Sequence, residues 1–230
     1  MANHLDLEEQ EQLDQLKHFW KQYGNFITWG LLAVLLSFAG WYGYQDWQSK
    51  QATQASALFE ELEVAVEKGD VSKAERAFLD MKERFASTTF AHQAGLLTAK
   101  TLHSNGRTDA AKEALRWVAE NASDKGYASI ARLRLSALLM EAKAYDEALA
   151  LLAEKTEPEF AALVSDRKGD IYVLQGQNDQ ARLEYKKALL ALQERAEYRR
   201  LVEVKLDAVG GTDEAAPVAT NAPNKADGSK

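Results

Sequence analysis

The apolar residues of this chain follow two different patterns, one before about residue 48 and one after it. Residues 26–44 read FITWGLLAVLLSFAGWYGY and contain no charged side chain. A helix of this length extends about 28 Å, which is close to the ~30 Å hydrocarbon core of a bilayer. From residue 48 to 207 the apolar residues recur every three or four positions, which is the period of amphipathic helices. The pattern predicts a membrane-spanning helix at 25–47 and an all-α, water-soluble region at 48–207.

Aromatic residues flank the apolar segment, as is typical of helices that cross a membrane–water interface. They are Trp29 near one end and Trp41, Tyr42, Tyr44 and Trp47 near the other. A buried core helix of this length would usually carry some polar residue. A cleavable signal peptide fits poorly, because the segment is longer than a normal apolar h-region and the preceding 25 residues are long and acidic. We therefore expect an uncleaved membrane anchor.

Basic residues near the two ends of the anchor predict its orientation. Lys17 and Lys21 precede it, whereas only Lys50 lies between it and Lys68. This bias places the N-terminus in the cytoplasm and the C-terminal region outside. Residues 1–24 are then expected to form a cytoplasmic amphipathic leader. Its apolar face consists of Leu13, Leu16, Trp20 and Tyr23, and Asp6 with Glu9 can form a capping box at its start. A plain solvated helix is the alternative, because acidic residues oppose binding to anionic lipids.

Four small residues of the anchor, Gly30, Ala33, Ser37 and Gly40, lie three, four and three positions apart. They share one stripe of the helix, where a second membrane helix could approach closely. Small residues are also simply common in membrane helices, so both interpretations stay open.

Four alanines mark an internal repeat: Ala74, Ala111, Ala148 and Ala181, at spacings of 37, 37 and 33. Each is followed four positions later by a large apolar or aromatic residue, and in three repeats a glycine lies five positions before it. In the third repeat that position is Lys143. The glycine can adopt the positive φ that ends a helix, and the alanine permits two antiparallel helices to approach closely. The spacing predicts four stacked α-hairpins, with an irregular helical bundle as the alternative.

The last repeat, DRKGDIYVLQGQNDQARLEYKKAL, resembles the tetratricopeptide signature. The matching positions are Gly169, Tyr172, Gly176, Ala181, Tyr185 and Ala188, whereas Ser165 departs from the bulky residue expected there. The resemblance implies a tetratricopeptide-like α-hairpin solenoid whose first helices line a peptide-binding groove. The groove positions that it implies are Gln93, Leu96, Lys100, His103, Ile130, Leu133, Ala137, Met140, Leu163, Asp166, Asp170 and Val173.

Composition narrows the chemistry to binding. The chain has no cysteine, its four histidines are scattered, and its formal net charge is −7. Disulfides and thiolate catalysis are excluded, and the acidic balance argues against nucleic acid as a partner. The sequence contains no phosphate loop or nucleophile elbow, so we expect neither a cofactor nor an enzyme. Residues 208–230 are poor in large apolar groups and are expected to be a disordered tail.

The layout as a whole resembles the YfgM-type ancillary subunits of the SecYEG translocon. The resemblance covers residues 5–206 and rests on the order and spacing of HFWKQYGNFITWG, WYGYQDWQSKQ, LRLSALL and the last repeat. It implies an inner-membrane protein with periplasmic repeats. It also implies three partners: the SecYEG translocon, a membrane-anchored parvulin-type periplasmic chaperone, and exported client proteins. A tethered adaptor of another envelope-assembly complex and a cytoplasmic docking module are the alternatives.

Overall fold

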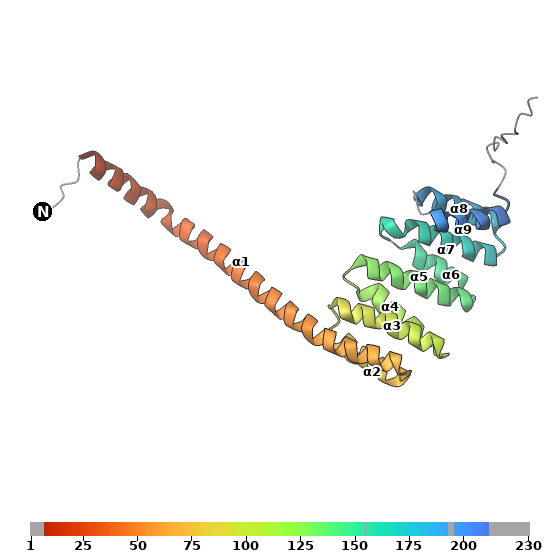
Figure 1. Cartoon of the computed structure of the whole chain (residues 1–230). Helices are drawn as coiled ribbons and strands as arrows, with labels where there is room; N and C mark the ends of the chain where they lie inside the picture. The colour runs from red at the N-terminus through yellow and green to blue at the C-terminus, as the bar shows by residue number, and fades with distance from the viewer. Residues whose placement is uncertain (1–6, 155, 193–195, 212–230) are drawn as a thin grey trace, which may run out of the picture. The chain divides into compact units, whose positions relative to one another are not determined.

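The computed structural model describes residues 7–154, 156–192 and 196–211, and these residues contain helices and turns but no strand. The chain divides into two compact units, residues 1–54 and 55–230, which we describe one at a time. The predicted all-α fold class is confirmed for the part of the chain that the structure describes (Figure 1).

The first unit consists of the N-terminal part of helix α1 (Leu7–Glu67). Its helix runs without a break through the residues predicted as leader and as anchor, and it is long and apolar enough to cross a membrane by length and composition. None of the most apolar stretch is buried against the rest of the chain. The side-chain hydroxyls of Thr28 and Ser37 donate to backbone carbonyls one turn earlier, Thr28 to Gly24 at 2.7 Å and Ser37 to Ala33 at 2.8 Å. Such internal bonds satisfy polar groups that a lipid environment cannot.

The predicted small-residue stripe lies on this exposed helix. A Cβ atom added at Gly30 or at Gly40 would have no described side chain within 4 Å apart from those of the adjacent residues. Its expected role in helix packing stays a prediction.

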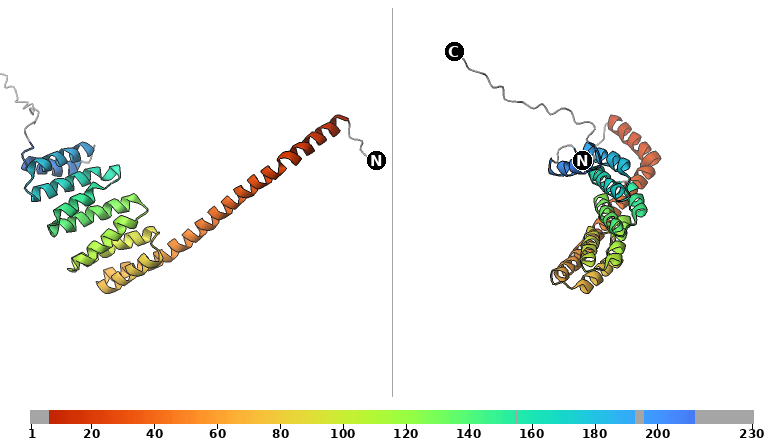
Figure 2. Two further views of the ribbon diagram at one scale, coloured as in Figure 1. Left: turned by 180° about the vertical axis from the view of Figure 1, so that it is seen from behind. Right: turned by 90° about the vertical axis from the view of Figure 1, so that its right-hand side faces the viewer.

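The second unit is a stack of antiparallel helices (Figure 2). The end of α1 pairs with α2, and the following helices pair as α3 with α4, α5 with α6 and α7 with α8. Helix α9 is the last helix of the stack. Their bounds are α2 (Val71–Arg84), α3 (Thr89–Ser104), α4 (Thr108–Asn121), α5 (Lys125–Glu141), α6 (Tyr145–Ala153), the short 3-10 helix η1 (Pro158–Phe160), α7 (Ala161–Leu174), α8 (Asn178–Ala191) and α9 (Ala196–Ala208). The four alanines of the sequence repeat lie on α2, α4, α6 and α8, and all four are completely buried. The four predicted hairpins are present.

The turns inside the four hairpins share one backbone geometry. Gly69, Gly106 and Gly176 have φ values of 71°, 76° and 72°, and Lys143 occupies the same place with a φ of 59°. At each turn the next residue donates its N–H to the carbonyl five residues earlier, as in Arg107 to Leu102 at 2.9 Å. This is the Schellman motif, which satisfies carbonyls that a helix end leaves free. The glycines were predicted for this reason, and Lys143 adopts the same conformation despite its side chain.

Replacing Lys143 with glycine is expected to raise the free energy of unfolding by about 0.5–1 kcal/mol. A left-handed conformation costs a non-glycine residue about 1–2 kcal/mol, and the greater freedom of glycine in the unfolded chain offsets part of the gain. The Lys143 side chain is exposed, so little packing is lost. Thermal unfolding of the full chain in detergent micelles measures the change. Gly106→Ala is the matched opposite and should lower the melting temperature; a Lys143→Gly variant that melts lower than wild type would contradict the argument.

The signature positions of the last hairpin serve packing. Gly169 lies directly under the Tyr185 ring, where a Cβ atom would collide with the ring carbons. Ala181 and Ala188 are completely buried, and Tyr172 packs at the edge of the same apolar cluster. This cluster joins α7, α8 and α9 through Ala162, Tyr185, Leu192, Val202, Leu206 and Val209. Helix α9 therefore covers the apolar face that the last hairpin would otherwise expose, as solenoids require of a terminal element.

The folded region ends later than predicted. Helix α9 includes Ala208, Val209 is buried in the last cluster, and a turn at Gly210 with a φ of 80° follows. The expected tail at 208–230 is thus wrong for its first four residues, because Val209 supplies apolar surface that the last hairpin buries. The remainder of the expected tail, residues 212–230, lies outside the described residues.

Candidate protein-binding face

The first helices of the hairpins share one face of the stack, and the predicted groove residues on it differ in accessibility. Lys100 and Val173 are exposed, Leu96 and Asp166 are buried, and the others are partly exposed: Gln93, His103, Ile130, Leu133, Ala137, Met140, Leu163 and Asp170. The face therefore has a central part that is open to a ligand and a C-terminal part that other side chains occupy.

The open part is a groove of about 410 Å³ between α3 and α5. This volume lies within the ~300–1,000 Å³ range of small-ligand sites. Its lining residues are Ala99, Lys100, His103, Leu115, Arg134, Ala137, Leu138 and Glu141. Three of the predicted groove residues, Lys100, His103 and Ala137, are therefore brought together here.

Two polar contacts show how α3 and α5 are aligned beside the groove. Arg134 Nη1 donates to the Leu96 carbonyl oxygen at 3.4 Å, and His103 Nε2 lies 3.7 Å from Glu141 Oε2. In both contacts the α5 residue is 38 positions after the α3 residue. The equal offset means that the two helices run parallel and that Leu138 lies level with Lys100. Arg134 is one turn away from that level, on the opposite wall.

Arg134, Leu138 and Glu141 line the groove but were not predicted from the sequence. The repeat spacing of 37 carried Lys100 onto Ala137 and His103 onto Met140, which are equivalent positions within successive hairpins. A groove between two neighbouring helices is lined by different sides of each helix, so the residues that meet across it are offset by 38. The signature of one repeat gives the spacing of 37 between equivalent residues, but it does not give the offset of 38 between residues in contact.

The C-terminal part of the face is closed by an ion-pair network. Lys205 on α9 places its Nζ 2.9 Å from both carboxylate oxygens of Asp166 and 3.0 Å from Oδ2 of Asp170. The Tyr198 hydroxyl donates to Asp166 at 2.7 Å, and the Tyr185 hydroxyl donates to Asp170 at 2.9 Å. Asp166 and Asp170 therefore anchor α9 to α7. The two acids were predicted to line a ligand groove. In the structure both carboxylates instead bind Lys205 and a tyrosine of the same chain.

Both tyrosines of this network stay protonated at neutral pH. Burial raises the pKa of Tyr185 and of Tyr198 well above the ordinary value, and the hydrogen bonds to Asp170 and Asp166 raise each pKa further. A protonated hydroxyl donates to a carboxylate, which strengthens the bond relative to a neutral acceptor. The network thus places two neutral donors and one cation around two carboxylates.

His92 on α3 is the other unusual polar residue of the unit. Its side chain is completely buried, and its ring lies 5.8 Å from the Trp117 ring and 6.5 Å from the Tyr127 ring. Burial lowers its pKa from 6.5, although neighbouring backbone groups and the Asp124 carboxylate oppose the shift. His92 is therefore a neutral core residue.

The unit is expected to lose stability as the pH falls through about 6.5, by up to about 1.4 kcal/mol for each pH unit. The unfolded chain takes up a proton on His92 near pH 6.5, whereas the folded chain does so only at lower pH. The unfolded state then binds more protons, so the free energy of unfolding decreases with decreasing pH. Urea unfolding of the full chain at pH 7.5 and pH 5.5 measures the loss. His92→Leu should reduce this pH dependence, whereas His103→Gln should leave it in place. If the free energy of unfolding changed equally with pH in wild type and in His92→Leu, His92 would not be the source of the pH dependence.

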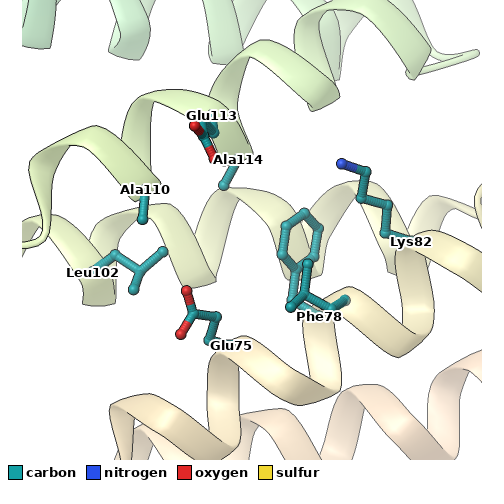
Figure 3. A pocket seen from close by; sticks show the side chains of 8 residues that line it. Glu75, Phe78, Lys82, Leu102, Ala110, Glu113 and Ala114 are labelled. Carbon is teal, nitrogen blue, oxygen red and sulfur yellow. The ribbon is translucent and has the colours of Figure 1, made fainter.

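A second, smaller pocket lies between α2 and α4, on the side of the stack formed by second helices. Figure 3 shows Glu75, Phe78 and Lys82 facing Ala110 and Ala114 across it, with Leu102 at one end. Its volume is about 70 Å³, well below that of a small-ligand site. Glu75 accepts two hydrogen bonds from Arg107, at 2.6 and 2.7 Å, so its carboxylate is engaged in joining successive hairpins. We assign this pocket to packing.

The described residues contain no group of three or more side chains that could hold a metal ion. The stacked hairpins, the Schellman turns and the terminal covering helix define the class of protein: a tetratricopeptide repeat-like helical scaffold that carries one candidate membrane-spanning helix.

Comparison with known proteins agrees with this class. A family model described as a tetratricopeptide repeat-like domain matches residues 17–211. A protein of Neisseria gonorrhoeae named ancillary SecYEG translocon subunit is 33% identical over 91% of this chain and 100% of its own length. Proteins of the same name from Haemophilus influenzae and Escherichia coli K12 are 30% and 24% identical, over 79% and 76% of this chain and 89% and 84% of their own lengths. The chain belongs to this family of ancillary SecYEG translocon subunits with a tetratricopeptide repeat-like domain, and the resemblance stated from the sequence is confirmed.

Proposed function

We propose that this chain is an inner-membrane scaffold of the SecYEG translocon. Its repeat domain holds exported polypeptides and passes them to a membrane-anchored parvulin-type periplasmic chaperone. The observation that carries the proposal is the match to proteins named ancillary SecYEG translocon subunits, which extends over 91% of the chain. An exposed apolar helix and an open groove on the repeat face support it, because they provide one surface for the membrane and another for polypeptide.

The proposed topology has the leader in the cytoplasm and the repeat domain in the periplasm. The basic residues Lys17 and Lys21 on the N-terminal side support this direction. A periplasm-active reporter enzyme fused after Gly211 tests it. An active fusion supports the proposed topology, and an inactive fusion together with an active cytoplasmic reporter would place the repeats in the cytoplasm.

The stripe of Gly30, Ala33, Ser37 and Gly40 is proposed to contact a membrane helix of the translocon or of the chaperone. Photo-crosslinking residues placed at Gly30, Ser37 and Gly40 should form adducts with these proteins. Positions on the opposite side of the helix, such as Leu31 and Leu35, are the matched controls. Lipid adducts alone from the stripe would overturn this contact.

Affinity purification from detergent-solubilised membranes tests the proposal as a whole. The full chain should recover translocon subunits and the parvulin-type chaperone, and a chain whose apolar segment is replaced by an unrelated membrane span should recover fewer of them. Recovery of another envelope-assembly complex in place of the translocon would favour a tethered adaptor of that complex.

A further inference from the structure

The groove between α3 and α5 combines an apolar floor with two cations that lack a counter-ion. Ala99, Leu115 and Leu138 are buried residues that form the floor. Lys100 and Arg134 are exposed on its two walls, and neither makes an ion pair with any residue that the structure describes. The side chain of Arg134 makes one weak hydrogen bond, at 3.4 Å to the Leu96 carbonyl. Most of its donors are therefore open to a ligand.

The two cations differ in this respect from several arginines that join helices of the repeat domain. Arg107 and Arg116 pair with acids of a neighbouring hairpin, at 2.6 and 2.9 Å, and Arg132 pairs with Glu154 of its own hairpin at 2.9 Å. The chain as a whole carries a net charge of −7, so acids are abundant. The acid of the groove itself, Glu141, lies at the far end and faces His103 at 3.7 Å. The positive charge of Lys100 and Arg134 is thus left without a partner in this part of the structure.

The helix register sets what could fit between the two cations. Because residues of α3 and α5 meet at an offset of 38, Lys100 lies level with Leu138, and Arg134 lies one helical turn, about 6 Å, from that level. Lysine and arginine both have long, flexible side chains, which suits them to bind one carboxylate from two sides of a groove. A guanidinium also offers two parallel donors that match the geometry of a carboxylate.

We propose that this groove selects polypeptide segments in which an apolar side chain lies next to a carboxylate. The apolar side chain packs on Ala99, Leu115 and Leu138, and the carboxylate, an Asp or Glu side chain, binds Lys100 and Arg134. This assignment rests on the proposed function, in which the repeat domain holds exported polypeptides. It adds a rule for which segments are held.

Fluorescence anisotropy with the full chain in nanodiscs tests the rule. The probes are three fluorescein-labelled, Gly/Ser-flanked peptides with amidated C-termini and a Leu-Leu-X centre, where X is Glu, Gln or Lys. The Glu peptide should bind about tenfold more tightly than the Gln peptide, and the Lys peptide should bind most weakly. Because both cations are exposed, the preference for Glu should decrease as the salt concentration rises.

A matched pair of variants locates the effect. Lys100→Gln/Arg134→Gln should abolish the preference for Glu over Gln. Arg76→Gln/Lys186→Gln removes the same charge from exposed positions on α2 and α8, and should keep the preference. Equal binding of the Glu and Gln peptides to wild type, an equal loss in both double variants, or no binding of any peptide would overturn the proposal.

Recovery of translocon subunits from membranes separates this proposal from the proposed function. The Lys100→Gln/Arg134→Gln variant should recover SecYEG as wild type does while losing the peptide preference, which supports the groove rule. Failure of the wild-type chain to recover SecYEG would overturn the proposed function, and the peptide result would still decide the binding rule of the groove.

Discussion

Replacing Lys205 with methionine is expected to destabilise the C-terminal part of the repeat domain by about 3–5 kcal/mol. The Lys205 ammonium is the one cation that contacts both Asp166 and Asp170 in the described structure. Methionine keeps much of the aliphatic stem but leaves two carboxylates close together, with the Asp166 side chain only 8% exposed. The remaining donors, Tyr198 and Tyr185, give each carboxylate one hydrogen bond and no positive charge. An uncompensated buried charge of this kind costs far more than the loss of a surface ion pair.

Urea unfolding of the full chain in detergent micelles measures this cost, and hydrogen exchange shows where it falls. The amides of α9 and of α7 should exchange faster, while those of α3 and α4 should change little. Lys186→Met is the control, because Lys186 is exposed on α8 and makes no ion pair with the described residues. The triple variant Asp166→Asn/Asp170→Asn/Lys205→Met should recover much of the stability, because it removes the charges together. A single Lys205→Met variant as stable as wild type would show that the network does not hold α9.

The hairpins could be predicted from sequence because each is specified by local requirements. A close helix crossing needs alanine, and a left-handed helix end favours glycine. Both requirements repeat with the hairpin, and their spacing therefore gave the number of hairpins and the position of each turn. The turn at Lys143 was found from its neighbours, since Ala148 lies five residues later as in the other three repeats. The residue itself carries no such signal.

The roles of Asp166 and Asp170 could not be predicted in the same way. A carboxylate at a groove position of a repeat predicts a role in ligand binding. Its actual partner, Lys205, lies 39 and 35 residues further on in a helix that does not belong to any hairpin. The sequence predicted a helical region up to residue 207 but gave α9 no place in the stack. Without that placement, no pattern connects the acids to their cation.

The boundaries predicted around the anchor differ from the ends of helix α1. The apolar segment predicted a membrane-spanning helix by length and composition, and helix α1 contains a segment that meets the same criteria. The sequence divided the region into leader, anchor and first repeat helix at residues 24 and 47. The structure has one uninterrupted helix from Leu7 to Glu67. Changes in polarity mark where the environment of a helix changes, but nothing in this stretch, such as proline or a positive-φ glycine, ends the helix itself.

The placement of α9 bears on function. By engaging Asp166 and Asp170, it removes the acids of the fourth hairpin from the face on which ligands are expected to bind. The accessible charges beside the α3–α5 groove are then dominated by Lys100 and Arg134, with Glu141 held near His103. The same ion pairs that hold the terminal helix therefore contribute to the positive character of the open part of the face.

Replacing Gly169 with valine is expected to destabilise the last hairpin by about 3 kcal/mol. A Cβ atom at this position would collide with the Tyr185 ring, so the ring or the helix must move. Overpacking of this kind typically costs about 1–3 kcal/mol. Movement of the ring also weakens the 2.9 Å hydrogen bond from Tyr185 to Asp170, which as a bond to a charged acceptor contributes about 1.5–3 kcal/mol. The higher helix propensity of valine returns only about 0.4 kcal/mol.

The loss of stability caused by Gly169→Val should depend on the Tyr185 ring. This dependence distinguishes a steric collision with the ring from a general destabilisation of helix α7. In a Tyr185→Leu background, Gly169→Val should lower the free energy of unfolding by less than about 1 kcal/mol, because the smaller side chain leaves room for the added methyl groups. Urea unfolding of the four chains of this double-mutant cycle gives the coupling directly. Additive effects of the two substitutions would mean that the collision does not occur and that α7 and α8 pack less closely at Gly169 than the structure shows. A strong coupling would establish the contact between Gly169 and Tyr185 as the reason why these two signature residues occur together.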